Sequence, residues 1–240
     1  MRLHRFYISP EITGELIAGN SIETTEEELV HQLKDVFRFE VGNRFVIFNG
    51  SGVEAEVEIK AINKKLVSFE TLQTMNGLMQ NAEIPRQITL AFALLKGEHT
   101  EIVLEKCTEL GVTTFQPLIT DRTIKTGFRK NRLEKIITEA TEQSGWSTLP
   151  DLHEPVALKD FLKEQRNLKS IFVMDMDGEN FKDLVSSTDK GPVMIFIGPE
   201  GGWSDEERRL FKDLNLKIFS LGKQTLRAET ACIAGVTSLI

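Results

Sequence analysis

From residue 88 onward, short apolar runs alternate with amphipathic segments, and this alternation restricts the possible folds more than any other feature of the sequence. Runs such as ITLAFALLK (88–96) and GPVMIFIG (191–198) have the length and apolar content of buried strands. Segments such as 98–110 and 204–215 instead place apolar residues at helical spacing. Strands that alternate with helices predict an α/β domain with a mainly parallel sheet.

Local signals predict where some of these helices begin and end. Gly111 follows the segment 98–110, at the position where a left-handed residue commonly ends a helix. Ser204 and Glu207 form the pattern of a capping box, so a helix should begin just after Ser204. The other expected strands and helices of this region cover 113–120, 129–145, 168–177, 216–222 and 229–240.

Residues 1–73 have a different pattern, and we expect a separate domain there. Thr25 and Glu28 predict a capping box at the start of a helix. The buried face of that helix should carry the apolar residues at helical spacing, Leu29, Leu33, Val36 and Phe37. Short strands with glycine- and asparagine-containing turns follow, which predicts a compact β-barrel. The polar segment 74–87 is the expected domain edge, so that the α/β domain spans 74–240.

The charge of the chain limits the classes of partner. The formal net charge of −7 over 240 residues argues against a general polyanion binder. Residues 121–135 are an exception, because they contain six basic and two acidic residues. This basic segment is either a phosphate-binding surface or the solvated face of a helix.

The sequence gives no sign of a membrane or metal partner. No apolar run is long enough for a membrane span, and the N-terminal residues lack the apolar core of a signal peptide. Cys107 and Cys232 are far apart, and neither they nor the four histidines have metal-ligand spacing. We therefore expect a cytoplasmic protein without a metal.

Two predicted strands end in unusual loops, at 197–202 (IGPEGG) and 221–230 (LGKQTLRAET). The strands are consecutive in the sequence, so we expect neighbouring strands whose loops meet at the carboxyl edge of the sheet, where ligands bind in such folds. Glycines would let a flat ligand approach the backbone, although tight turns between strand and helix are the alternative explanation. The dinucleotide-binding, P-loop, G-x-S-x-G and H-E-x-x-H patterns are absent.

The two loops also carry a resemblance to a known family. IGPEGGWSDEE and SLGKQTLRAETACIAGV resemble the signature of the 16S ribosomal RNA uridine-N3 methyltransferases of the RsmE type, in the SPOUT superfamily. HQLKDVFRFEVGNRFVIFNGSG, LEKCTELGVTTFQPLITDRT and EATEQSG extend the similarity along the chain. The resemblance implies a PUA-like β-barrel, a SPOUT α/β domain with a deep trefoil knot, and a homodimer. It also implies S-adenosylmethionine as cofactor and 16S rRNA, within the small ribosomal subunit, as substrate.

The resemblance further implies a set of cofactor-binding residues. Gly198, Glu200, Gly201 and Gly202 would pack against a bent cofactor, and the loop 221–230 would close over it. For Met174, the alternative to a cofactor-lining role is that of a residue of the hydrophobic core. The complete implied set is Met174, Ile197, Gly198, Pro199, Glu200, Gly201, Gly202, Leu221, Gly222, Leu226, Arg227 and Thr230.

The implied reaction needs a group that stabilises the uracil anion formed when the N3 proton leaves. Preorganised positive charge performs this task best, and the planar guanidinium of Arg227 suits a two-point contact. Its alternative role is to bind a phosphate or the cofactor's carboxylate. Glu229 is the second catalytic candidate, with pairing to Arg227 or capping of the following helix as alternatives. Thr230 has the same capping alternative.

An RNA substrate also requires phosphate contacts and an accessible target base. Trp146 stands where the family usually has arginine, so it either stacks on a base or is buried in the dimer. The residues that the family pattern implies at the RNA surface are Arg2, Arg5, His31, Arg38, Arg122, Lys125 and Arg129, each of which is otherwise an ordinary surface charge.

Two other functions stay open at this level. The first is a ribosome-associated RNA-binding protein without catalysis, which the cofactor loops and Arg227 disfavour. The second is a SPOUT methyltransferase that acts on another RNA position, which the N-terminal barrel and the EATEQSG segment disfavour.

Overall fold

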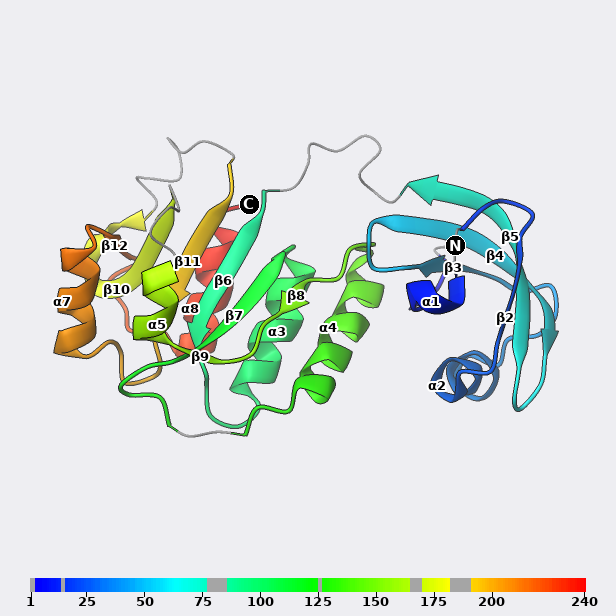
Figure 1. Cartoon of the computed structure of the whole chain (residues 1–240), viewed down its shortest axis with the longest axis horizontal. Helices are drawn as coiled ribbons and strands as arrows, with labels where there is room; N and C mark the ends of the chain where they lie inside the picture. Colours follow the sequence, from blue (N-terminus) through cyan, green and yellow to red (C-terminus); the bar gives the residue numbers. More distant parts are fainter. Residues whose placement is uncertain (1–2, 14–15, 77–85, 125–126, 165–169, 182–190) are drawn as a thin grey trace. The chain divides into compact units, whose positions relative to one another are not determined.

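The computed structural model describes residues 3–13, 16–76, 86–124, 127–164, 170–181 and 191–240, and the chain forms two compact units (Figure 1). The first unit comprises Met1–Ile84 with Thr141–Leu149, and the second comprises Pro85–Ala140 with Pro150–Ile240. The sequence predicts a single domain edge near residue 74. The return of 141–149 to the first unit is an additional feature that no local sequence signal indicated.

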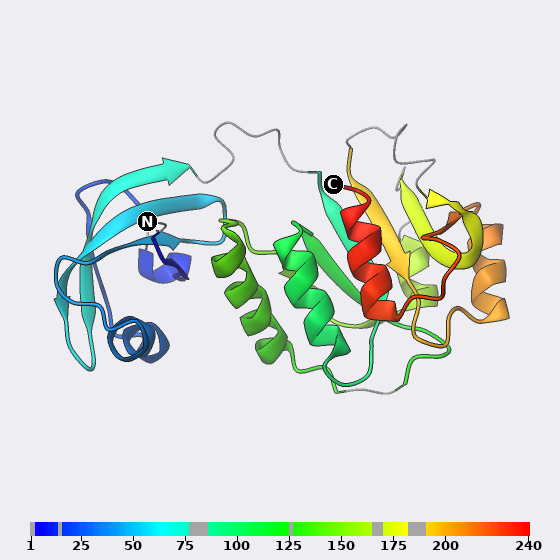
Figure 2. The same ribbon diagram turned by 180° about the vertical axis from the view of Figure 1, so that it is seen from behind.

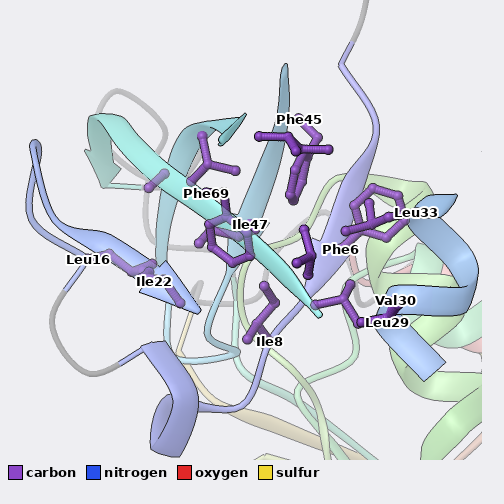
Figure 3. Close-up of a cluster of buried hydrophobic side chains, with 14 residues drawn as sticks. Phe6, Ile8, Leu16, Ile22, Leu29, Val30, Leu33, Phe45, Ile47 and Phe69 are labelled. Atoms are coloured by element: carbon purple, nitrogen blue, oxygen red, sulfur yellow. The ribbon is translucent and has the colours of Figure 1, made fainter. Parts of the chain in front are cut away.

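The first unit is built on a five-stranded sheet with the order β1-β3-β4-β5-β2. β1 and β3 are parallel, and the other neighbouring pairs are antiparallel. Figure 3 shows the buried cluster that fills this unit, including Phe6, Phe45 and Phe69. The strands are β1 (Arg5–Tyr7), β2 (Ser21–Thr24), β3 (Arg44–Phe48), β4 (Val53–Ile62) and β5 (Val67–Asn76), and the short helix α1 covers Pro10–Thr13.

The expected helix of this unit is present, but its predicted capping box is wrong. Helix α2 (Glu27–His31) begins after the N-cap residue Glu26, whose side chain makes no capping hydrogen bond. The side-chain oxygen of Thr24 instead accepts a hydrogen bond from the backbone N–H of Glu26, at 3.2 Å. The turn that leads into the helix is therefore held one residue earlier than the sequence pattern indicated.

Only half of the residues predicted for the buried face of this helix are buried. Leu29 and Leu33 are buried, whereas Val36 is 58% exposed and Phe37 is 37% exposed. The cause is a π-helical segment, η1 (Gln32–Val36), that directly continues α2. A π-helical turn contains more residues than an α-helical one, so the residues after it lose the phase that the α-helical spacing predicted.

The second unit contains a sheet of the order β12-β10-β11-β6-β7-β8, with β9 also paired to β7. Every pairing in the described part of this sheet is parallel, which confirms the predicted class. The strands are β6 (Ile88–Ala93), β7 (Thr114–Ile119), β8 (Asp151–Leu152), β9 (Val156–Ala157), β10 (Ile171–Asn180), β11 (Val193–Ile197) and β12 (Lys217–Ser220).

Helices lie on both faces of this sheet (Figures 1 and 2). One layer holds α3 (His99–Glu109), α4 (Lys130–Ser144) and α8 (Ala228–Thr237), and the opposite face carries α5 (Leu158–Glu164). Helix α7 (Asp205–Asp213) packs with α5, because Phe211 joins Phe161 and Leu162 in one buried cluster. No helix in the described part of the chain has the length and apolar character needed to cross a membrane.

Local features place the helices that border the candidate site. Gly111 has a φ of +85° after α3, and Ser204 and Glu207 form both hydrogen bonds of a capping box, so both predicted signals are confirmed. Gly235 allows α8 to approach β11 closely, since a Cβ atom there would lie 2.6 Å from Ile195 Cδ1. This close packing fixes α8 against β11.

Candidate functional site

A pocket of about 300 Å³ lies at the carboxyl edge of the second sheet. Its lining comes from residues 174–176 of β10, residues 197–203 at and after the end of β11, the end of β12 with the following loop and helix start, and Arg208 of α7. The two predicted loops do meet in one pocket. The expectation that they follow neighbouring strands is wrong, however, because β10 lies between β11 and β12.

β10 contributes to the pocket because its pairing with β12 is interrupted for four residues. Met174 and Glu179 both oppose Phe219, so that residues 175–178 form an excursion beside the pocket. A Cβ atom on Gly178 would overlap the backbone of Phe219. A side chain at position 178 is therefore incompatible with this backbone path, which sets Asp175 and Met176 in the pocket wall.

The local structure explains why glycine stands at two positions of the 197–202 loop. The N–H of Gly202 donates to the carbonyl oxygen of Pro199 at 2.8 Å, and Gly202 has a φ of +67°. A Cβ on Gly198 would lie 3.0 Å from the indole ring of Trp203. Trp203 is 1% exposed, and its Nε1 donates to the carbonyl oxygen of Met174 at 2.9 Å. The absent side chain at position 198 therefore makes room for Trp203, which in turn ties this loop to β10.

The loop after β7 is attached to the same region by polar contacts. Arg122 Nη1 donates to the carbonyl oxygen of Gly201 at 2.6 Å. Asp121 Oδ2 accepts from Ser204 Oγ at 2.6 Å, and its backbone N–H donates to Glu207 Oε1 at 2.9 Å. Arg122, a predicted RNA-binding residue, is thus exposed next to the pocket loop.

An ion pair forms part of the pocket wall. Arg208 Nε and Nη2 donate to Asp175 Oδ2 and Oδ1, at 2.7 and 3.2 Å. The side chain of Asp175 is 8% exposed and that of Arg208 is 34% exposed. The hydrogen bonds to Asp175 raise the pKa of the Arg208 guanidinium. Sequence patterns did not reveal this pair, because the two residues lie 33 positions apart and follow no common motif.

The loop after β12 carries the catalytic candidates. Leu221, Gly222 and Leu226 line the pocket, whereas Arg227 and Thr230 are exposed residues outside its lining. Arg227 is the N-cap residue of α8 and makes no side-chain capping bond there. Its position directly between Leu226 and Ala228, which both line the pocket, sets its backbone at the pocket rim.

Glu229 is buried and points to a different partner from the one expected. Its Oε1 lies 3.1 Å from Nδ1 of His99, while Arg227 is not within ion-pair distance. The capping alternatives for Glu229 and Thr230 are wrong, since the N-cap residue of α8 is Arg227. The carboxylate of Glu229 lies in the first turn of α8, where negative charge interacts favourably with the helix dipole.

The predicted RNA-binding residues have different environments. Arg5 is not a free surface cation, because its Nη2 lies 2.6 Å from Glu54 Oε2 and its guanidinium lies over the Phe48 ring. It also donates to the carbonyl oxygen of Trp146, a half-buried residue. His31 is exposed and pairs with Asp35, and Arg38 and Arg129 are exposed. Arg2 and Lys125 lie outside the described residues.

The basic segment 121–135 is partly neutralised by neighbouring acids. Arg132 forms a two-point pair with Glu101, at 2.6 and 2.9 Å. Lys130 lies 3.6 Å from Glu154. Arg122 and Arg129 are therefore the stronger candidates for phosphate contacts in the described part of this segment. Among the described residues, no group of acidic, histidine or cysteine side chains has the arrangement of a metal site.

The fold and the pocket define a class of protein: an α/β enzyme that binds its ligand at the carboxyl edge of a parallel sheet, joined to a small β domain. The family descriptions agree, because an RNA methyltransferase domain matches residues 82–240 and an RNA methyltransferase PUA domain matches residues 25–72. The chain belongs to this family of RNA methyltransferases. It has a PUA-like N-terminal domain and a SPOUT methyltransferase C-terminal domain.

Individual relatives make the comparison more specific. The ribosomal RNA small subunit methyltransferase E of Rickettsia conorii is 30% identical, over 100% of this chain and 96% of its own length. The Synechocystis sp. enzyme of the same name is 32% identical, over 95% of this chain and 74% of its own length. A Neisseria gonorrhoeae enzyme of the same name, solved with S-adenosyl methionine bound, has a TM-score of 0.87 at 26% identity, covering 99% of this chain and 97% of that one. A Legionella pneumophila methyltransferase in complex with SAM has a TM-score of 0.86 at 32% identity, covering 100% and 97%.

Proposed function

We propose that this protein transfers a methyl group from S-adenosylmethionine to N3 of a uridine in the 16S rRNA of the small ribosomal subunit. The single observation that carries the proposal is the pocket in which the 197–202 and 221–230 loops meet. Full-length similarity to the small subunit methyltransferases E supports the choice of substrate.

The residues of the pocket fit S-adenosylmethionine. Its volume of about 300 Å³ is at the lower end of the range for small-molecule sites. Met174, Ile197 and Leu226 supply apolar surface, while the glycine-rich loop lets the polar edge of an adenine approach the backbone. When bound, this cofactor supplies an electrophilic methyl group on a sulfonium. Met174, Ile197, Leu221 and Leu226 would hold it, together with the backbone of 198–202.

Arg227 is the proposed catalytic residue. The N3 proton of uridine must leave before or during methyl transfer, and the negative charge then spreads onto the uracil oxygens. Arg227 is exposed and stands between two pocket-lining residues, Leu226 and Ala228, so its guanidinium is the proposed group that stabilises that charge. Glu229, in the first turn of α8, pairs with His99 at the start of α3, so we assign Glu229 the role of holding the first turn of α8, which follows the N-cap residue Arg227.

The substrate and the assembly follow from the same family. Arg122, Arg129, His31 and Arg38 are the proposed RNA contacts, because all four are exposed. We also propose a homodimer, a trefoil knot in the second unit, and action in the cytoplasm on the ribosomal subunit. Light scattering would test the dimer, with twice the monomer mass of 27.1 kDa as the expected value.

Nucleoside mass spectrometry tests the proposal in cells. We expect 16S rRNA from a strain without this gene to lack one N3-methyluridine, and an intact copy of the gene to restore it. A copy that carries Arg227→Gln should restore the modification poorly, because the anion would lose its cation. An unchanged N3-methyluridine content in the deletion strain would contradict the proposed substrate.

The rival function is a ribosome-associated RNA-binding protein without catalysis. Only the small β unit and the basic residues favour it. Calorimetry with S-adenosylmethionine separates the two, since a protein that binds RNA but not the cofactor would fit the rival and not the proposed enzyme.

A further inference from the structure

The wall of the pocket contains a cation that the proposed reaction has not used. Among the described residues that line the pocket, Arg208 is the one with a positive charge, and Asp175 and Glu200 carry negative charges. Arg227 lies outside this lining. For a negatively charged group inside the pocket, Arg208 is therefore the cationic side chain in the lining.

The guanidinium of Arg208 is held in a fixed orientation. Two of its five N–H donors point to the Asp175 carboxylate, from Nε at 2.7 Å and from Nη2 at 3.2 Å. Among the described residues, the ion-pair partner of its Nη1 is the exposed Asp205, at a distance of 3.9 Å, and Asp177 also acts on the guanidinium electrostatically. No described residue contacts Nη1 more closely, so its N–H groups are available to a ligand, while the buried Asp175 carboxylate fixes the orientation of the guanidinium plane through two hydrogen bonds.

The charge of the proposed cofactor supplies a matching group. S-adenosylmethionine carries a sulfonium, an amino group and one carboxylate, and only the carboxylate needs a cationic partner. A charge-assisted hydrogen bond from a guanidinium is among the strongest contacts available for such a group. We propose that Arg208 binds the carboxylate of the cofactor's methionine part through its Nη1 edge, and that Asp175 is a positioning residue that fixes Arg208. This inference rests on the proposed function.

Decarboxylated S-adenosylmethionine isolates the contact, because it lacks the carboxylate but keeps the adenosine, the sulfonium and the amino group. Calorimetry should give a lower Kd for S-adenosylmethionine than for the decarboxylated form with the unmodified protein. Arg208→Gln should weaken binding of S-adenosylmethionine by about 10- to 100-fold and change binding of the decarboxylated form by less than about 3-fold. The preference for the carboxylate would then nearly disappear.

Two further variants keep the inference testable if Arg208→Gln does not fold. Arg208→Lys retains a charge without the planar fork, so it should recover part of the preference. Asp175→Asn leaves Arg208 in place but weakens its anchor, so it should reduce the preference by a smaller factor. Arg209→Gln is the matched control, because Arg209 is an exposed neighbour on α7 outside the pocket lining, and it should leave both Kd values unchanged.

The outcomes separate this inference from the proposed function. If the unmodified protein binds both compounds equally, or Arg208→Gln weakens both equally, Arg208 does not recognise the carboxylate. If Arg227→Gln instead abolishes the preference, the carboxylate contact belongs to Arg227. If the unmodified protein binds neither compound, the cofactor assignment itself fails.

Discussion

Trp203 donates its indole N–H to the carbonyl oxygen of Met174, at 2.9 Å, and thereby joins the glycine-rich loop after β11 to the strand beside it. The ring is fully buried and packs edge-on against Phe211, with ring centroids 5.0 Å apart. Met174 is the last residue of β10 before the excursion into the pocket wall. One aromatic side chain therefore sets the relative position of two of the segments that form the candidate cofactor site.

Gly198→Ala should disturb this arrangement. The added methyl would lie 3.0 Å from the buried Trp203 ring, which is closer than ordinary van der Waals contact, so the ring would have to shift. We expect a loss of about 1–3 kcal/mol in the free energy of unfolding, measured by chemical denaturation. Cofactor affinity should fall as well, since Gly198 lines the pocket. Gly127→Ala is the control, because nothing lies within 4 Å of its Cβ position, and equal losses for both variants would contradict this account.

Gly178→Ala should damage the excursion of β10. A Cβ atom there overlaps the backbone of Phe219, so residues 175–178 must move away from β12. We expect a loss of about 3 kcal/mol in unfolding free energy, with weaker cofactor binding measured by calorimetry. Glu179→Ala, at the exposed next position, should have a small effect on both. A Gly178→Ala protein with unchanged affinity would show that the excursion does not shape the site.

Arg122→Gln should weaken binding of 16S rRNA. Its guanidinium is exposed beside the pocket loop, so the loss of one phosphate contact should lower the salt dependence of binding by about one unit of slope. Filter binding at several salt concentrations measures this slope. Arg132→Gln changes the net charge equally, but Arg132 is already paired with Glu101. Equal effects of the two variants would mean that only overall charge matters.

Burial raises the pKa of both thiols, Cys107 and Cys232, far above the usual value. The native protein should therefore not react with a thiol reagent at pH 8, whereas the unfolded chain should react at two sites. Stability should also depend on pH. Above about pH 8.5 only the unfolded chain loses these protons, so the free energy of unfolding should fall by up to about 1.4 kcal/mol per pH unit for each thiol.

Cysteine variants separate this effect from that of other groups. Cys107→Ala should make the alkaline decline in stability less steep than in the unmodified protein, with the difference appearing only above about pH 8.5. Parallel denaturation curves at pH 7 and pH 9.5 measure it. Rapid labelling of the native protein at pH 8 would show that the thiols are accessible.

Local patterns predicted much of the second unit. Buried runs located β6, β7, β10, β11 and β12, although not the two-residue strands β8 and β9, and the capping residues Ser204 and Glu207 behave as the sequence indicated. Both loops of the candidate cofactor site were noted from the sequence, the first because three glycines follow a predicted strand and the second because it resembles a family signature. Such signals are short-range, and the physical cause of each lies within a few residues.

Features that depend on distant contacts were not predicted. The insertion of β10 between β11 and β12 is a property of the whole sheet, and it adds Asp175 to the pocket wall. The pairing of Asp175 with Arg208 requires that topology, so no spacing rule could indicate it. The π-helical turn that exposes Val36 also has no clear local signal. Arg5 matched a family pattern, but the sequence did not show that Glu54 pairs with its charge.

The most direct test of the proposed function is methyl transfer with purified protein. Small ribosomal subunits from the deletion strain would be incubated with the protein and S-adenosylmethionine that carries a trideuterated methyl group. Mass spectrometry of the 16S rRNA nucleosides should then show one deuterated N3-methyluridine per subunit, and Arg227→Gln should slow its appearance by about 10²-fold or more. A label on a ribose or on another base would contradict the assigned position, and the absence of any label would contradict the enzyme itself.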